Sequence, residues 1–333
     1  MNKEQTITGV IRGTGACVPE RILDNKEIAG FVDTSDEWIR ERTGVRRRRI
    51  AEKETTVSMA CEAGRQAVEE AGILPGEIDM ILVATGSPDQ IFPCTACQVQ
   101  EALGADGAVG FDLNAACSGF LFAYNTAQAY IASGIYRTVL VIGSESISRL
   151  VDWTDRGTCI LFGDGAGAVL LQAAEGKTYR PAAHSDGSGG EALTGPGVRN
   201  RIRSIDKDVR EAKTEYITMN GKDVFQFAVR KVPQVIQEVL EENDLSVEDI
   251  DWFVLHQANA RIVDAVARRL HIGIEKFPMN LQEYGNTSSA SVPILLNELN
   301  RNGLLKKGQK LVLAGFGAGL SWGADILEWD IKG

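Results

Sequence analysis

The chain has 333 residues, of which 44% are hydrophobic and 24% are charged, a composition typical of a soluble globular protein with one large domain or two smaller ones. Aspartate and glutamate (45) outnumber lysine and arginine (35), and the net charge of −10 argues against a general nucleic-acid binder. The sequence has no apolar run of membrane-spanning length and no recognisable signal peptide, so we expect a cytoplasmic protein that does not enter a membrane.

Helix and strand patterns alternate along the chain. An amphipathic helix is expected over residues 57–71, followed by a buried strand over 80–84. A second helix is expected over 121–133, followed by a buried strand over 138–143. Residues 186–215 are rich in glycine and charge and predict a long loop. Apolar strands interleaved with helices indicate an α/β fold whose sheets are covered on both faces.

The sequence also matches itself at a constant shift of 172 residues. The strand expected over 80–84 corresponds to one expected over 252–255, which again follows a helix, here over 232–242. The same shift pairs Asn114 with Asn286. We interpret the match as two copies of one supersecondary unit, packed as two similar halves.

Cys117 is the first candidate for chemistry. It lies in the segment Asn-Ala-Ala-Cys-Ser-Gly (114–119), directly before an apolar helix. A thiol at a helix N-terminus feels the positive end of the helix dipole and free backbone N–H groups, and both favour the nucleophilic thiolate. The alternative is a buried cysteine that only packs.

His256 and Asn286 are the next candidates. His256, one of three histidines, follows the strand over 252–255, where α/β sheets place functional groups. Since Asn286 is the duplicate of Asn114, the repeat would bring the Cys117 loop and the Asn286 loop to equivalent places. The alternatives are a histidine at the edge of the core and an asparagine that caps a helix.

Several other motifs are weaker. The glycines of 315–321 follow a strand and could present N–H groups to an oxyanion, whereas 13–15 and 163–167 match cofactor loops poorly, and close backbone packing is favoured for the latter. Cys94 and Cys97 have CxxC spacing, but no second pair of zinc ligands lies nearby in the sequence.

Basic residues form a run over 46–49 and recur at Arg261, Arg268 and Arg269. A solvated charged surface is the ordinary interpretation. The functional one is capture of phosphates or of an acidic partner.

Nine segments that follow one another along the chain carry a family pattern: 34–39, 42–44, 92–93, 114–119, 155–157, 162–167, 256–259, 285–288 and 315–319. As an ordered set they resemble the β-ketoacyl-acyl-carrier-protein synthase III family. The resemblance implies the thiolase fold, an internally duplicated five-layer αβαβα sandwich. The half over 1–172 would carry the nucleophilic cysteine, and the half over 173–333 would carry the histidine and the asparagine.

The resemblance also implies a reaction, the decarboxylative condensation of an acyl-CoA primer, expected to be acetyl-CoA, with malonyl-acyl-carrier protein. Cys117 would take the acyl group as a thioester, and His256 and Asn286 would hydrogen-bond the malonyl thioester carbonyl and stabilise the enolate. Backbone N–H groups of Cys117 and Gly319 would form the oxyanion hole. Neither a metal nor a cofactor is expected, because the departing carboxylate supplies the carbanion.

Binding residues follow from the same resemblance. For CoA, Trp38 and Arg156 would hold the adenine, Arg42 the phosphates and Asn259 the pantetheine arm. Phe92 would reach across a homodimer and limit the partner's acyl pocket. The acidic carrier protein would dock on a basic patch made of Gln257, Ala258, Asn259, Ala260, Arg261, Arg268 and Arg269. Gln226 departs from the pattern, because some family members have a lysine there.

Other functions remain open at this point. A starter enzyme of a polyketide pathway would share Cys117, His256 and Asn286 but use a different primer. A non-catalytic partner that binds the carrier protein, and a zinc or thiol-redox protein built on Cys94 and Cys97, are the remaining alternatives.

Overall fold

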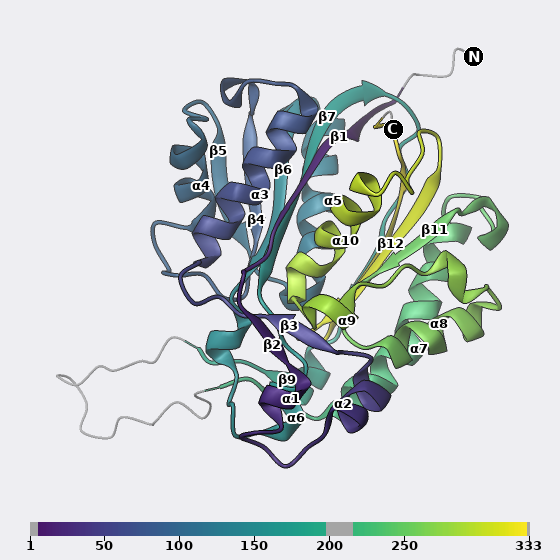
Figure 1. Cartoon of the computed structure of the whole chain (residues 1–333). Coiled ribbons are helices and arrows are strands. Elements are labelled where there is room, and N and C mark those ends of the chain that lie inside the picture. Colours follow the sequence, from purple (N-terminus) through teal and green to yellow (C-terminus); the bar gives the residue numbers. More distant parts are fainter. Residues whose placement is uncertain (1–5, 198–215, 332–333) are drawn as a thin grey trace.

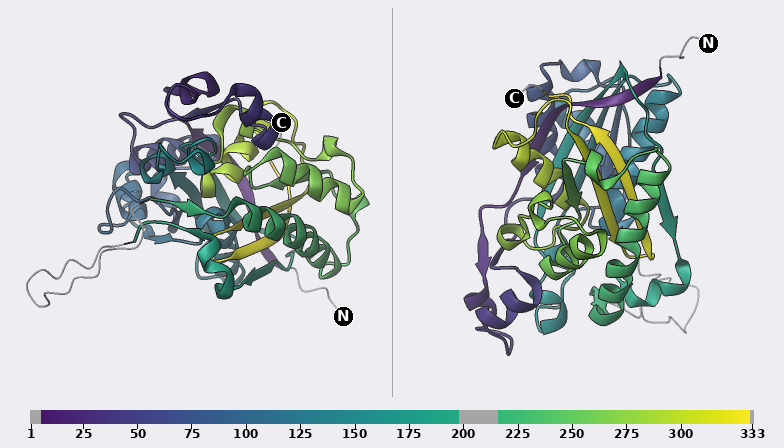
Figure 2. Two further views of the ribbon diagram at one scale, coloured as in Figure 1. Left: turned by 90° about the horizontal axis from the view of Figure 1, so that it is seen from below. Right: turned by 90° about the vertical axis from the view of Figure 1, so that its right-hand side faces the viewer.

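The computed structural model describes residues 6–197 and 216–331. Two β-sheets stack face to face, with helices between them and on both outer sides, and this gives the five layers αβαβα (Figures 1 and 2). The first sheet has the strand order β1-β7-β6-β4-β5, and the second has the order β11-β12-β13-β8. The strands are β1 (Ile7–Cys17), β4 (Met80–Ala84), β5 (Val109–Leu113), β6 (Thr138–Glu145), β7 (Gly165–Glu175), β8 (Ala182–Ser185), β11 (Trp252–Leu255), β12 (Lys310–Gly317) and β13 (Ser321–Glu328).

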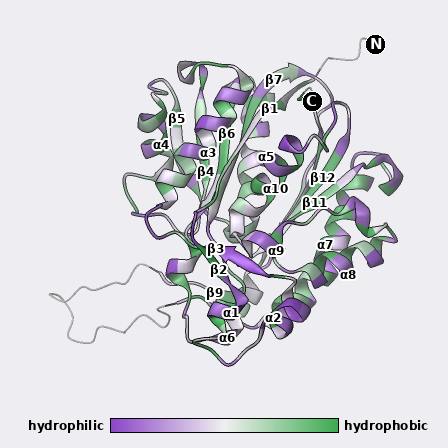
Figure 3. Cartoon of the chain, viewed as in Figure 1, coloured by the Kyte–Doolittle hydropathy of each residue, from purple (hydrophilic) through white to green (hydrophobic). Residues whose placement is uncertain are grey.

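Helices form the other three layers. The outer layer of the first sheet has α3 (Thr56–Ala71) and α4 (Thr95–Leu103), the middle layer has α5 (Gly119–Ala132) and α10 (Ser291–Arg301), and the outer layer of the second sheet has α7 (Gly221–Glu241) and α8 (Ala260–Leu270). Strands buried on both faces need apolar side chains at every position, and β4 and most of β6 meet this requirement (Figure 3). The apolar core is correspondingly divided into clusters between neighbouring layers.

The internal repeat is confirmed in the topology. In each half, a central strand pairs parallel with the next strand of the repeat, β4 with β6 and β11 with β12, and the sheet continues through antiparallel strands. The short helices η2 (Ala116–Ser118) and η7 (Ser288–Ala290) occupy equivalent positions before α5 and α10. Their residues Ala116 and Ser288 both have a left-handed backbone, with φ of 47° and 50°.

A smaller cap covers one end of both sheets, the lower end in Figure 1. It contains α1 (Asn25–Ile28), α2 (Asp36–Thr43), α6 (Arg156–Cys159) and α9 (Leu281–Tyr284), with the strand pairs β2 (Ile22–Asp24) with β3 (Arg47–Arg49) and β9 (Leu193–Thr194) with β10 (Thr218–Met219). The guanidinium of Arg48 is buried in the cap, where it donates to Asn25 Oδ1 and to the carbonyl of Ile160. Burial lowers the pKa of Arg48 to about 10.

The predicted elements agree closely with the observed ones, with two differences. The helix expected over 232–242 is the second half of α7, which begins at Gly221 after the N-cap Asn220 and continues through Pro233. The boundary predicted between residues 172 and 173 falls inside β7, which ends at Glu175. Part of the loop expected over 186–215 forms η4 (Gly187–Ala192) and β9, and residues 198–215 lie outside the described residues.

Close packing explains the two weak glycine motifs. A Cβ on Gly15 of β1 would lie 2.0 Å from the carbonyl oxygen of Ala63 in α3, and one on Gly167 of β7 would lie 2.4 Å from the amide nitrogen of Ile294 in α10. The glycines therefore allow helices to approach the sheet, as expected for segment 163–167. Among the described residues, no helix combines the length and hydrophobicity needed to cross a bilayer.

Candidate active site

The nucleophile candidate lies at the turn between β5 and α5. Asn114 caps this turn, because its Oδ1 accepts from the backbone N–H of Ala116 at 3.1 Å. Cys117 follows in η2 and is only 8% exposed. Burial raises the pKa of Cys117 to about 12 and the charge of Glu145 adds to this, whereas a hydrogen bond with the side chain of Ser288 opposes it. The resting group is thus a thiol, not the thiolate predicted from the helix N-terminus.

His256 follows β11 and is buried, with Phe316 packed edge-on against its ring at 5.3 Å. Its Nδ1 lies 2.7 Å from the hydroxyl oxygen of Ser291, which also accepts from the backbone N–H of Gln257 at 3.3 Å. This network favours donation of the Ser291 proton to Nδ1, so the ring proton sits on Nε2. Burial lowers the pKa of His256 to about 3, so the imidazole is neutral.

Asn286 lies on the equivalent turn of the second half. Its Oδ1 accepts from the backbone N–H of Ser288 at 2.9 Å, just as Asn114 caps the turn of Cys117. The backbone around Asn286 is fixed by a bridge to Phe162. Because Oδ1 is engaged, the carboxamide presents its Nδ2 hydrogens as donors.

One cavity of about 560 Å³ brings these residues together. Its lining includes Cys117, His256 and Asn286, which lie far apart in the sequence. The end of β12 forms the wall behind the thiol. A Cβ on Gly317 would lie 2.8 Å from the amide nitrogen of Cys117, so this position leaves no room for a side chain. The cavity is also lined by Leu320, which follows the predicted oxyanion-hole residue Gly319.

We call the side of the cavity that is lined by Arg42 of the cap and by Asn259 and Arg261 at the start of α8 its mouth. The guanidinium carbons of Arg156 and Arg42 lie 4.8 Å and 5.5 Å from the ring centre of Trp38. These three residues therefore lie together in the structure. The side chain of Asn259 caps α8 and donates from Nδ2 to the carbonyl of Arg42 at 3.0 Å, so it joins α8 to α2. Figure 3 shows hydrophilic residues along both helices.

The predicted basic patch needs one correction. Gln257 is 1% exposed, and its amide donates to the carbonyl of Leu255 and accepts from the N–H of Asn280, so it cannot contact a docking partner directly. The other members lie at the surface of α8 and its start, with Ala258, Asn259 and Ala260 half-buried and Arg261, Arg268 and Arg269 exposed. Lys222 lines the cavity one helical turn before Gln226 and supplies a positive charge that Gln226 does not.

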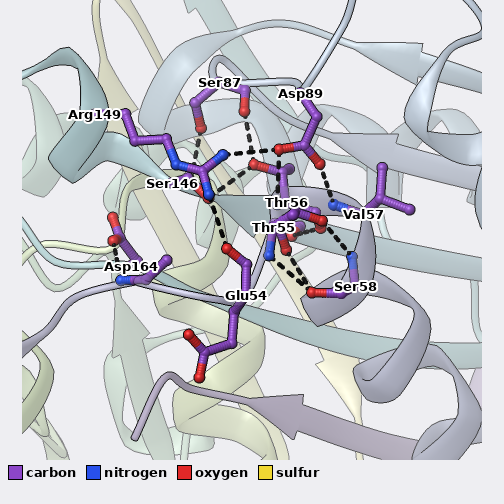
Figure 4. Close-up of polar contacts among 12 residues, drawn as sticks. Glu54, Thr55, Thr56, Val57, Ser58, Ser87, Asp89, Ser146, Arg149 and Asp164 are labelled. Atoms are coloured by element: carbon purple, nitrogen blue, oxygen red, sulfur yellow. Dashed lines mark hydrogen bonds and ion pairs between the residues drawn. The ribbon is translucent and has the colours of Figure 1, made fainter. Parts of the chain in front are cut away.

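Phe92 is not part of the cavity of its own chain. It is 82% exposed, in the segment between β4 and α4, and its neighbour Ile91 is also exposed. The start of this segment is anchored firmly, as Figure 4 shows: Asp89 accepts from the N–H of Val57 at 2.9 Å and pairs with Arg149. The segment is therefore held in place at Asp89 and presents the apolar side chain of Phe92 to the outside.

Cys94 and Cys97 lie at the start of α4 as free thiols, with their sulfurs 3.4 Å apart. Within the described part of the chain, no three histidine, cysteine or acidic side chains are grouped so that they could hold a metal ion.

Three polar residues of the site were not singled out from the sequence: Glu145, Ser288 and Ser291. The two serines lie in the same segment as Asn286, 284–291, but serine near a helix start has many roles. Glu145 gave a clearer signal, because an acidic residue lies two positions after the end of the apolar run 138–143.

The chain was compared with protein families and known proteins. Residues 111–187 and 240–329 match the family models of 3-oxoacyl-[acyl-carrier-protein] synthase III and of its C-terminal part. The β-ketoacyl-[acyl-carrier-protein] synthase III of Clostridium acetobutylicum is 48% identical over 320 residues, which cover 96% of this chain and 98% of that protein. The crystal structure of the synthase III from Aquifex aeolicus has 43% identity and a TM-score of 0.89 and covers 96% of this chain and all of the other.

A priming β-ketosynthase from the R1128 polyketide pathway is also similar, with 36% identity and a TM-score of 0.92, covering all of this chain and 99% of that one. The duplicated five-layer architecture and these neighbours define a condensing enzyme of the thiolase fold. The chain belongs to the β-ketoacyl-[acyl-carrier-protein] synthase III family. It is an acyltransferase that catalyses the condensation initiating fatty acid synthesis, and the polyketide and non-catalytic alternatives are not favoured.

Proposed function

We propose that the enzyme condenses an acyl-CoA primer, with acetyl-CoA as the expected one, with malonyl-acyl-carrier protein through a thioester on Cys117. The observation that carries this proposal is the single cavity in which a buried thiol meets two neutral hydrogen-bond donors, His256 and Asn286. The products are 3-oxoacyl-carrier protein, CoA and CO2. In the first half-reaction the Cys117 sulfur attacks the acyl-CoA carbonyl, and the backbone N–H groups of Cys117 and Gly319 stabilise the oxyanion.

In the second half-reaction, Nε2–H of His256 and Nδ2–H of Asn286 donate to the thioester carbonyl of the malonyl group. As CO2 leaves, negative charge collects on this oxygen, and two donors already fixed in place stabilise it without reorganisation. The neutral state of His256 supports this role, because its Nε2 proton is held by the Ser291 hydrogen bond at Nδ1. The carbanion then attacks the acyl group on Cys117 and releases the sulfur.

The cavity mouth suits CoA. Adenine would lie between the ring of Trp38 and the guanidinium of Arg156, which are 4.8 Å apart and would separate to admit it. Arg42 and Lys222 would face the phosphates, with Asn259 beside the pantetheine arm. The acidic carrier protein would approach the same mouth over the exposed arginines of α8 and deliver its own pantetheine arm.

We also propose a homodimer formed at β5. This strand is the edge of the first sheet, and Val109 at its start is 47% exposed. Unpaired edges invite pairing, and a two-fold arrangement of β5 strands would make one continuous sheet. It would also bury Ile91 and Phe92, and it would allow Phe92 to reach the partner's acyl pocket.

The test is acylation followed by intact mass. Incubation with acetyl-CoA alone should add one acetyl group, about 42 Da, to the wild type and none to Cys117→Ala. Malonyl-carrier protein should then discharge the acetyl group. Absence of acylation by acetyl-CoA and by longer or branched acyl-CoA would refute the proposal.

A further inference from the structure

Arg48 and Asn25 form a buried polar pair inside the cap that the reaction described above does not use. Arg48 has no exposed surface, and Asn25 is 1% exposed. The guanidinium donates to Oδ1 of Asn25 at 2.7 Å, and also to the carbonyls of Ile160, at 2.5 Å, and Leu23, at 3.3 Å. Among the described residues, no carboxylate forms an ion pair with it. Burying a charge without such a partner is costly, so its place in the cap calls for an explanation.

The carboxamide of Asn25 holds both ends of α2. Its Nδ2 donates at 2.8 Å to Oδ1 of Asp36, the first residue of the helix. The same nitrogen donates at 2.9 Å to the carbonyl of Val45, the second residue after the helix. Trp38 and Arg42 lie on α2 between these two anchors. Asn25 therefore fixes the helix that carries the residues expected to bind CoA.

Arg48 connects Asn25 to α6. Ile160, whose carbonyl accepts from the guanidinium, directly follows α6 and lines the active-site cavity. The helix begins with Arg156, whose guanidinium lies 4.8 Å from the ring centre of Trp38. The helices α1, α2 and α6 lie together in the cap (Figure 1). One continuous path of hydrogen bonds thus runs from α2 through the buried pair to the end of α6.

We propose that Arg48 and Asn25 are positioning residues for the CoA part of the primer. They fix the backbones of α2 and α6 relative to each other, and so keep a slot for adenine between Trp38 and Arg156. Both are buried, so they act through the two helices and not by touching the ligand. The proposal rests on the CoA contacts of Trp38 and Arg156 proposed above.

The length of the two helices explains why they need such a support. They have eight and four residues, and helices this short are held in place by tertiary contacts and not by their own hydrogen bonds. A slot whose walls are already ordered saves the conformational entropy that would otherwise be lost when the ligand binds. The buried guanidinium suits this task, because its planar fork donates to two groups at once.

The test compares two primers in the complete enzyme. Acetyl-CoA and acetyl-pantetheine carry the same reacting thioester, but only acetyl-CoA carries the adenine nucleotide. Acetylation of Cys117 is followed by quenched intact mass over a range of primer concentrations, which gives a KM and a maximal rate for each primer. Asn25→Ala removes the anchors of α2. Arg48→Met keeps the apolar stem of the side chain and removes the guanidinium.

Asn243→Ala is the matched control. Asn243 is also buried, at 7% exposure, and its carboxamide also makes three hydrogen bonds, two with the backbone of Arg180 and one with the carbonyl of Val239. It lies just after the end of α7, whereas residues at the start of α7 line the cavity. Circular dichroism and thermal melting verify that each variant folds.

We expect Asn25→Ala and Arg48→Met to raise the KM for acetyl-CoA about tenfold, because adenine loses part of its stacking. Their KM for acetyl-pantetheine and their maximal rates should stay within about twofold of the wild type. Asn243→Ala should change neither KM. In a Trp38→Ala background, Asn25→Ala should raise the KM for acetyl-CoA by less than about twofold, because no ring remains to be positioned.

Several results would overturn the positioning role: equal rises in KM for the two primers, wild-type values for both, a selective rise in Asn243→Ala, or a full further rise in the double variant. Should Arg48→Met not fold, Asn25→Ala decides the matter. A different result concerns the proposed function itself. If the wild type had the same KM for both primers, adenine would not be bound, and the proposed CoA contacts would fall together with the positioning role.

Discussion

Replacement of Ser291 by alanine tests how His256 is held. The Ser291 hydroxyl lies 2.7 Å from Nδ1 of His256 and 3.3 Å from the backbone nitrogen of Gln257, and all three residues are at most 2% exposed. The variant leaves both nitrogens without this partner in a site that water does not reach freely. Loss of a buried hydrogen-bond partner costs about 1–3 kcal/mol. The ring is then free to carry its proton on Nδ1, and Nε2 loses the hydrogen that would bind the malonyl carbonyl.

The two half-reactions separate this effect from general damage. Since about 1.4 kcal/mol corresponds to a factor of ten, we expect condensation with malonyl-carrier protein to slow about 10- to 100-fold in Ser291→Ala. Acetylation of Cys117 should stay within about twofold of the wild type, because the hydrogen bonds of the Ser291 hydroxyl go to His256 and Gln257 and not to the thiol. Acetylation is followed by intact mass and condensation by release of CO2.

A matched control is available in Ser144→Ala. Ser144 is also fully buried, and its hydroxyl donates to the carbonyl of Thr56 at 2.7 Å, away from the site. It should lower the free energy of unfolding by a similar amount but leave the ratio of the two half-reactions unchanged. If Ser291→Ala slowed both half-reactions by one factor, or slowed neither, the reasoning about the imidazole proton would be refuted.

Three further predictions concern binding, pH and packing. Trp38→Ala should raise the KM for acetyl-CoA about tenfold or more, because an aromatic ring stacked on a base contributes about 1–3 kcal/mol, and acylation at saturation should change little. The pKa of His256 is about 3 in the folded protein against the usual 6.5, so the free energy of unfolding should fall as the pH drops from about 6.5 to 3, by about 5 kcal/mol in all. Denaturant unfolding measured across this pH range should show the loss in the wild type and not in His256→Asn. Gly167→Ala should lower the free energy of unfolding by about 1–3 kcal/mol, whereas Gly187→Ala, where a Cβ meets open space, should not. Thermal melting compares the two variants, and equal melting temperatures would contradict the packing argument.

Most of the fold could be predicted from the sequence because strands buried on both faces are read from apolar runs alone. The predicted strands at 80–84 and 252–255 match β4 and β11 in full. The start of α7 was missed because Pro233 lies inside the helix, and proline normally marks a helix start or break. The long buried face of α7 compensates for the missing hydrogen bond, and this compensation depends on packing that a sequence window does not contain.

The site was predicted less evenly. The candidate catalytic residues Cys117, His256 and Asn286 stood out because thiol, imidazole and carboxamide are chemically distinctive and follow predicted strands. The state of the thiol was predicted wrongly, since the helix N-terminus is visible in the sequence whereas burial beside Glu145 is not. Gln257 was assigned to the surface for the same reason: its neighbours along the chain are exposed, and only the fold shows that its amide is buried between Leu255 and Asn280.

The duplication places the same type of turn in both halves of the site. Each half places an asparagine before a left-handed residue, Asn114 before Ala116 and Asn286 before Ser288, and each asparagine caps the turn in the same way. The first turn then presents the thiol of Cys117, and the second presents the carboxamide of Asn286. The same asparagine-capped turn therefore supports two chemical tasks, one in each half. The shift of 172 residues reveals this shared turn, but only the packing of the halves brings Asn286 and Cys117 into one cavity.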